Sequence, residues 1–157
     1  MPNIDRTDEQ ILALLQKNAR MSNKEIGAEL NLAASTIWSR VKQLEEEGVI
    51  TGYRAEVNPK ALGAGLQALV AVRLAQHSIS NIQHFRSHLR DTPEVVAIYH
   101  VGGLNDFLLH VDAIDADHLR EVILKTLAMS PEVAHLETSI IFEHARSAAL
   151  PVYRRAT

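Results

Sequence analysis

The segment Ser22–Glu45, SNKEIGAELNLAASTIWSRVKQLE, decides the fold of the first part of this chain. It opens with Ser22 and has Glu25 three residues later, which is the capping-box pattern of a helix N-terminus. Asn31 occupies a position where a sharp turn needs left-handed backbone, which asparagine tolerates. We therefore predict two short helices joined by a three-residue turn, an arrangement that presents its second helix to the major groove of DNA.

The second helix of this segment has one apolar and one polar side. Ile37, Val41 and Leu44 fall at i, i+4 and i+7, which predicts a buried stripe. The other sides carry hydroxyl, basic and aromatic groups that suit base edges, sugars and phosphates. The residues predicted to contact DNA are Ser35, Thr36, Trp38, Ser39, Arg40 and Lys42.

Structural alternatives exist for this polar side. The whole helix could be an ordinary amphipathic helix with a solvated face. Arg40 could pair with Glu45 or Glu46, and Trp38 could pack in a dimer instead of stacking on a sugar. Residues 1–60 carry eight Lys/Arg and nine Asp/Glu, 8 − 9 = −1, so DNA binding must depend on a local patch supported by dimerisation.

The neighbouring segments complete a winged helix-turn-helix. An earlier helix should begin near Asp5 or Thr7, with Thr7 as a suitable N-cap. Gly48 should end the last helix, and residues 49–57 have the composition of a strand, either a wing or a connecting strand.

The second half of the chain repeats a strand–helix–strand pattern. The predicted strands are residues 66–74, 95–101, 106–113 and the segment after Val133, and the predicted helices are residues 79–90 and the segment capped by Asp115. Two such units form a four-stranded antiparallel sheet with both helices on one face, the ferredoxin-like βαββαβ arrangement. The other sheet face should be buried against a second subunit. We divide this α+β chain into residues 1–52, a hinge strand and linker over 53–65, and residues 66–157.

Composition narrows the class of protein. The 157 residues have a net charge of −3 and include no cysteine, which excludes disulfides, thiolate metal sites and cysteine nucleophiles. The start lacks a signal peptide and no apolar run would span a bilayer, so we expect a cytoplasmic protein with no membrane partner. We see no catalytic triad, close carboxylate pair or metal cluster and expect neither an enzyme nor a bound cofactor or metal.

Two long motifs carry a family resemblance. The first is Ser35-Thr36-x-x-x-Arg40-Val41-Lys42-x-Leu44-Glu45-x-x-Gly48-x-Ile50-x-Gly52-Tyr53, followed by Asn58-Pro59. The second is Gly102-x-x-x-Asp106-Phe107-Leu108-Leu109. Together they resemble the Lrp/AsnC (feast/famine) family of transcription regulators, from Asp5 to about Glu143. The resemblance implies a DNA-binding head, a hinge strand and a ligand-sensing domain that dimerises and often assembles into octamers.

The same resemblance implies a small-molecule effector, usually an amino acid, bound between subunits near the glycine–aspartate loop. A two-glycine turn can also be only a tight turn that needs glycine backbone. Yet it offers N–H donors to a carboxylate and an acidic acceptor to an ammonium. The residues predicted to bind the effector are Gly102, Gly103, Leu104, Asn105 and Asp106. Two departures from the family pattern are Ala33-Ala34, which gives a weak N-cap, and Leu104, which could shape a different pocket.

Other motifs favour ordinary structure. Gly63-x-Gly65-x-x-Ala68 precedes a strand and so lacks the context of a dinucleotide fingerprint. His84 and His88 have the spacing of a zinc pair but should face solvent with no third ligand. Two other functional classes stay open: a metabolite sensor that does not bind DNA, and, more distantly, an enzyme.

Overall fold

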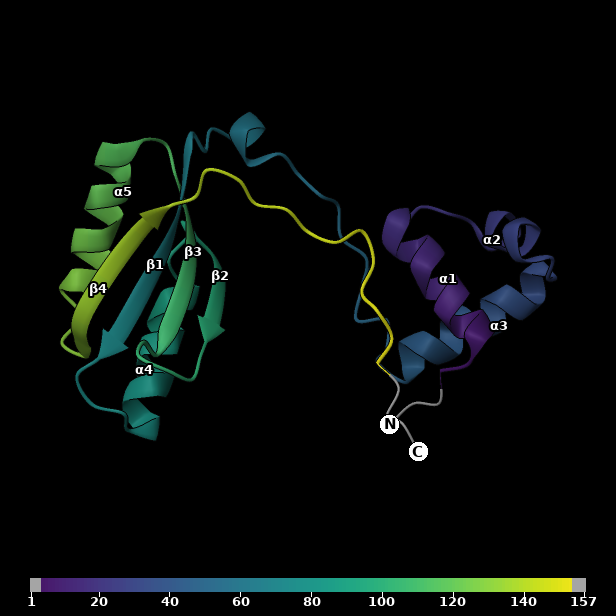
Figure 1. The fold of residues 1–157 in the computed structure, drawn as a ribbon, viewed down its shortest axis with the longest axis horizontal. Coiled ribbons are helices and arrows are strands. Elements are labelled where there is room, and N and C mark those ends of the chain that lie inside the picture. The colour runs from purple at the N-terminus through teal and green to yellow at the C-terminus, as the bar shows by residue number, and fades with distance from the viewer. Residues whose placement is uncertain (1–3, 154–157) are drawn as a thin grey trace. The chain divides into compact units, whose positions relative to one another are not determined.

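The computed structural model describes residues 4–153, which fall into two compact units (Figure 1). The residues up to Glu56, together with those from Ala145 onward, form what we call the helical unit. Val57–His144 forms the sheet unit. The division at 1–52, 53–65 and 66–157 stays a prediction about domains.

The helical unit contains three helices around a small core. They are α1 (Arg6–Lys17), α2 (Asn23–Leu30) and α3 (Ala34–Glu46). Its buried apolar side chains are Ile11, Ile26, Ile37 and Leu44. The predicted stripe of α3 is thus confirmed, with Val41 partly buried against the same core.

Three predictions for the termini of these helices are confirmed. Ser22 caps α2 and its hydroxyl accepts from the N–H of Glu25, whose carboxylate accepts from Ser22 in return. Asn31 adopts left-handed backbone at φ 55° and ends α2. Gly48, at φ +69°, follows the last turn of α3.

Two other predictions for this unit are wrong. Asp5, not Thr7, is the N-cap of α1, and it forms a capping box with Asp8. The predicted strand over 49–57 does not form in the described structure. The N–H groups of Val49 and Ile50 both donate to the carbonyl of Leu44, so they close the end of α3 instead of entering a ladder. Residues 51–58 are exposed.

The sheet unit has the predicted ferredoxin-like topology. Its four strands are β1 (Leu66–Leu74), β2 (Val95–His100), β3 (Phe107–Ala113) and β4 (Val133–Ile140), in the antiparallel order β2-β3-β1-β4. The helices are α4 (Ile79–Arg90) and α5 (Ala116–Val122), which continues as a π-helical turn over Ile123–Ala128. A short 3₁₀ helix, η1 (Pro59–Leu62), precedes β1.

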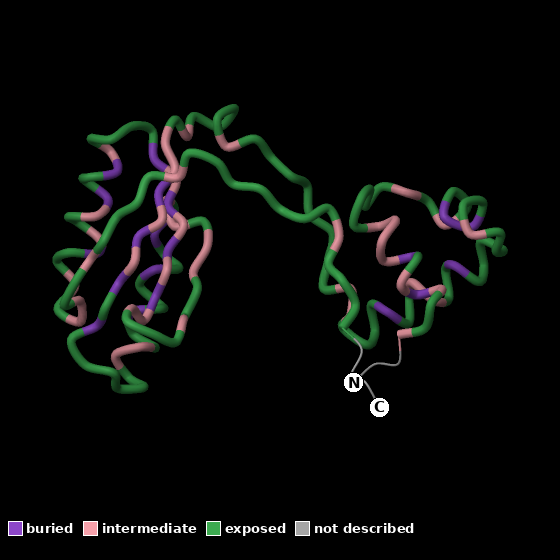
Figure 2. The backbone as a smooth tube through the Cα atoms, viewed as in Figure 1, coloured by how far each residue is buried: buried purple, intermediate pink, exposed green. Residues whose placement is uncertain are grey.

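Both helices cover the same face of this sheet. Alternate residues of β1 and β3 point into one core, which also receives Phe85 and Leu89 from α4 and Leu119 and Val122 from α5. Figure 2 shows the resulting alternation of buried positions along β1 and β3. The predicted alternation of β1, with Leu66, Ala68, Val70, Val72 and Leu74 on one face, is confirmed.

The opposite sheet face lacks a helical cover, and its composition is mixed. It combines partly buried Leu69 and Leu108 with polar side chains. His110 also lies on this face. Its Nε2 atom is buried and has no hydrogen-bond partner in the described structure. Among the helices of the described residues, none has the length and apolar content needed to cross a membrane.

Candidate functional site

The turn between α2 and α3 depends on close backbone packing. The N–H groups of Asn31 and Leu32 both donate to the carbonyl of Gly27. A Cβ atom on Gly27 would lie 2.5 Å from the carbonyl oxygen of Leu32, so no other residue type fits without moving this turn. The turn therefore fixes where α3 starts relative to α2.

The polar side of α3 faces solvent, as predicted. Ser35, Thr36 and Ser39 are exposed, and the Lys42 side chain is 54% exposed. The Ser39 hydroxyl donates to the Thr36 carbonyl over 2.9 Å, which leaves its lone pairs available to an incoming donor. The N-terminus of α3 is capped by Ala33, whose side chain accepts no hydrogen bond, so the predicted weak cap is confirmed.

Trp38 and Lys42 form a second exposed pair on α3. The Lys42 ammonium lies 5.3 Å from the centroid of the Trp38 ring, a cation–π distance, and 3.6 Å from the Glu46 carboxylate. Trp38 is 56% exposed, a large apolar surface on a helix that is otherwise polar on this side. The two residues thus offer a flat ring and a cation next to each other.

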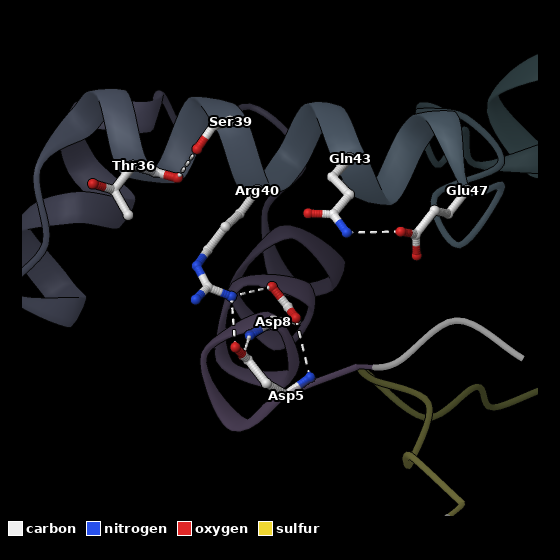
Figure 3. A network of polar contacts seen from close by, with 7 residues as sticks. All are labelled: Asp5, Asp8, Thr36, Ser39, Arg40, Gln43 and Glu47. Carbon is white, nitrogen blue, oxygen red and sulfur yellow. Dashed lines mark hydrogen bonds and ion pairs between the residues drawn. The ribbon is translucent and has the colours of Figure 1, made fainter.

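Arg40 points away from this face, toward α1 (Figure 3). Its Nη1 atom donates to Asp5 Oδ2 and to Asp8 Oδ1, each over 2.8 Å. The predicted alternative partners, Glu45 and Glu46, are therefore wrong: Arg40 does form ion pairs, but with the carboxylates that cap α1. We refer to Asp5, Asp8 and Arg40 as the arginine clamp.

The clamp shifts the pKa values of Asp5 and Arg40. The pKa of Asp5 is lowered, because its carboxylate accepts from the Asp8 N–H and from the Arg40 guanidinium. The carboxylates of Asp5 and Asp8 in turn raise the pKa of Arg40. Asp8 is 9% exposed, so one anion of the clamp is held in a buried position.

The loop between β2 and β3 is the second candidate site. Gly102, Gly103 and Leu104 are exposed, and Asn105 is partly buried. Within residues 4–153, the N–H groups of these four consecutive residues donate to no protein acceptor. Gly103 has φ +145°, a backbone conformation that side chains other than hydrogen disfavour.

Asp106 anchors this loop to β1. Its Oδ2 atom accepts from the Leu74 N–H and its Oδ1 atom lies 2.8 Å from Nδ1 of His77. Its own N–H donates to the Val72 carbonyl. The carboxylate is thus partly buried and already hydrogen-bonded, so it holds the end of β1 beside the exposed glycine turn.

Two family models match almost the whole chain. A winged helix-turn-helix DNA-binding model covers residues 4–51, which include α1 to α3. The Lrp/AsnC ligand binding domain covers residues 67–149. This chain belongs to the Lrp/AsnC family. It is accordingly a DNA-binding transcription regulator with a ligand-binding domain.

Relatives and solved structures of the Lrp/AsnC family agree over nearly the full length. The transcriptional regulator AldR of Mycolicibacterium smegmatis is 38% identical over 147 residues, 94% of this chain and 86% of its own. The leucine-responsive regulatory protein of Haemophilus influenzae is 31% identical and covers 91% of this chain and 86% of its own. The regulator NMB0573 of Neisseria meningitidis, solved in complex with L-Met, is 29% identical, with a TM-score of 0.88 over 95% of this chain and 97% of its own. The named relatives are transcription regulators.

The histidine pair on α4, which is predicted to lie at the surface, contacts neighbouring segments of this Lrp/AsnC protein. His84 and His88 are exposed, but His84 Nδ1 lies 2.6 Å from Glu132 and His88 Nε2 lies 3.1 Å from the Thr126 carbonyl. They connect α4 to the segment between α5 and β4. The pKa of Glu132 is lowered chiefly by a hydrogen bond with its own backbone, and the contact with His84 lowers it further. Residues 4–153 contain no group of three or more ligating side chains placed to hold a metal ion.

Sequence reasoning missed Gly27, Asp5, Asp8 and His77 as residues that shape the two sites. A glycine inside an eight-residue helix was a usable signal for Gly27, because glycine weakens helices unless packing requires it. The acidic pair Asp-x-x-Asp before an apolar stripe was a usable signal for the capping box. His77 carried no signal in the sequence.

Proposed function

We propose that this regulator binds its operator through the solvent-facing side of α3. The residues that would contact bases, sugars or phosphates are Ser35, Thr36, Trp38, Ser39 and Lys42. The single observation that supports this most is that all five are exposed on one rigid helix, whose apolar residues are in the core. Arg40 is not among them because its guanidinium already donates to Asp5 and Asp8.

We also propose that the loop over residues 102–106 binds a free amino acid. Four consecutive backbone N–H groups without a protein acceptor can receive a carboxylate. The partly buried Asp106 carboxylate supplies negative charge beside them for an ammonium group. The L-Met complex of the Neisseria regulator supports this class of ligand.

The uncovered sheet face supports a homodimer. It exposes Leu69 and Leu108 partly, and it holds the buried Nε2 atom of His110, which makes no hydrogen bond within the described residues and lies 3.4 Å from Asp112 Oδ1. A second copy would bury this face and bring two heads to one operator, and further assembly, up to an octamer, could place the loops between subunits. Because the operator lies on the chromosome, the protein would act in the cytoplasm, as a regulator without catalytic activity.

Genome-wide footprinting tests the DNA-binding proposal, with and without each of the twenty common amino acids. We expect protected sites that share a roughly palindromic sequence, with half-sites about one helical turn apart. We expect at least one amino acid to change occupancy. A footprint that is absent, or insensitive to replacement of Lys42 and Ser39, would contradict the proposed interface.

The effector loop is tested by a thermal-shift assay with the same twenty amino acids. Asp106→Asn removes the charge but keeps a carbonyl oxygen for the Leu74 N–H, so it should spare the fold and abolish the shift. Asp106→Ala should also lower the melting temperature without ligand, because the Leu74 N–H loses its acceptor. A ligand-induced shift of full size in Asp106→Asn would exclude this carboxylate from the site.

A further inference from the structure

Arg40 lies next to Ser39 in the middle of α3, and its charge would suit a DNA phosphate. Its position in the structure indicates another use. One guanidinium nitrogen, Nη1, carries two hydrogens, and each is directed to a different carboxylate of α1. These contacts connect residues 35 and 32 positions apart in the sequence, so they join α3 to the start of α1.

The two carboxylates are themselves fixed. Asp5 Oδ1 accepts from the Asp8 N–H over 2.9 Å, and Asp8 Oδ2 accepts from the Asp5 N–H over 3.0 Å. The remaining oxygen of each carboxylate is the one that accepts from Arg40. The capping box of α1 therefore holds a rigid pair of acceptors, and a planar guanidinium matches such a pair better than a flexible ammonium does.

Charge opposes the release of Arg40 to a phosphate. The clamp holds one cation and two anions, so its net charge is −1. If Arg40 turned to DNA, two neighbouring carboxylates, one of them buried, would lose their shared cation. The contact that Arg40 gained with a phosphate would be offset by this loss.

We infer that Arg40 is a positioning residue for operator recognition and not a phosphate ligand: the arginine clamp fixes α3 against α1, so that Ser39 and Lys42 are presented at a set angle. This inference rests on the DNA interface proposed above. It predicts that loss of the clamp weakens binding to the correct sequence, while the electrostatic attraction to any DNA stays the same.

The test uses the full-length protein and an operator selected by the wild type from a random duplex pool. Specific and non-specific affinities are measured as a function of salt concentration for Arg40→Gln, Lys42→Ala and the double variant Asp5→Asn/Asp8→Asn. Asparagine is itself a good N-cap, so the double variant keeps the cap of α1 but removes the anions that hold Arg40. Circular dichroism sets a temperature at which each variant is folded, and Arg86→Gln, an exposed arginine on α4, is the matched charge control.

A positioning role predicts the same result for Arg40→Gln and for the double variant. Specific affinity should fall about tenfold in both, and the non-specific affinity and salt slope of Arg40→Gln should stay unchanged. Lys42→Ala should instead reduce the slope by about 0.9 per DNA-binding head, the value for one lost phosphate contact. Arg86→Gln should bind as the wild type does.

Other outcomes would overturn the inference. A phosphate ligand would make Arg40→Gln lose about 0.9 of the salt slope per DNA-binding head and would make the double variant bind the operator more tightly, because Arg40 would be freed to reach a phosphate. A purely structural role would leave the affinity of every folded variant unchanged. If Arg40→Gln does not fold, the double variant decides between the two roles: weaker operator binding supports the positioning role, and tighter binding indicates a phosphate ligand. A wild type that selects no sequence would overturn the proposed DNA interface as well. If the wild type does select an operator, the result expected for a phosphate ligand or for a purely structural role would overturn the positioning role alone.

Discussion

The core of the helical unit contains four buried apolar residues, whereas thirteen buried residues form the core of the sheet unit, counted over the described residues. The sheet unit is also held by the antiparallel ladders that β1 forms with β3 and with β4. The helical unit relies instead on polar groups at the ends of its helices: the capping boxes of α1 and α2 and the arginine clamp.

This difference affects how each unit can carry a function. In the helical unit the functional groups are side chains on α3, and their placement depends on a small core and a few charged contacts. In the sheet unit they are backbone N–H groups in a loop, placed by strands that a large core holds in register. The same kind of mutation should therefore have different consequences in the two units.

The largest effect is expected from a cavity in the smaller core. Ile37→Ala removes a side chain with no exposed surface and should lower the free energy of unfolding by about 2–5 kcal/mol. With so few buried neighbours, we expect the helical unit to unfold separately and DNA binding to be lost. Chemical denaturation followed by circular dichroism would show this as an early transition, with the sheet-unit transition retained.

Leu62→Ala is the control for that cavity. Leu62 is 77% exposed, so its truncation should change stability by less than about 0.5 kcal/mol. If Ile37→Ala instead shows one transition, shifted as a whole, the two units unfold together, and the smaller core does not set a separate stability for the helical unit.

A smaller effect is expected from backbone strain in the loop. Gly103→Ala places a Cβ at φ +145° and should cost about 1–3 kcal/mol. Gly102→Ala is the matched control, since Gly102 is not in this backbone region and an added Cβ meets nothing within 4 Å. Thermal denaturation and amino-acid titration should both separate the two variants. Equal behaviour would mean that the loop relaxes and does not hold its N–H groups in place.

Next in size is the loss of one hydroxyl on α3. Ser39→Ala should weaken operator binding about fivefold per DNA-binding head, the value of one hydrogen bond of about 1 kcal/mol. Its stability should not change, because the hydroxyl contacts only the Thr36 carbonyl of its own helix. Mobility shifts on the operator and on unrelated DNA are the measurement. A loss of the same factor on both would assign Ser39 to phosphate and not to a base.

Local signals in the sequence were sufficient for most of the architecture. The Ser22–Glu25 pair, the turn residue Asn31 and the alternation of β1 each specify a structure within a few residues. The solvent-facing side of α3 followed from the stripe of Ile37, Val41 and Leu44, because a regular helix fixes both sides at once.

The errors concern residues whose role depends on distant partners. The pattern around Arg40 gave two acidic neighbours on its own helix, but the structure pairs it with Asp5 and Asp8, which only the packing of α1 against α3 brings close. Residues 49–57 have strand composition, yet a strand needs a neighbouring strand, and the chain uses Val49 and Ile50 to close α3. The anchoring of Asp106 depends on the register of β3 beside β1, which the sequence does not specify.

The smallest expected effect is the response of the helical unit to acid. The pKa of Asp5 lies below its ordinary 3.8, chiefly because of the Asp8 N–H and Arg40, and the pKa of Glu25 lies below 4.5 because of Ser22. A lowered pKa in the folded state means that the stabilisation is complete above the unfolded value and is lost as the pH falls through the folded one. The melting temperature of the helical unit should therefore be constant above about pH 5 and fall below about pH 4.

Glu25→Gln, which keeps an amide oxygen for the Ser22 N–H, should reduce this dependence of the melting temperature on pH. An undiminished dependence in Glu25→Gln would assign the acid sensitivity to the arginine clamp alone.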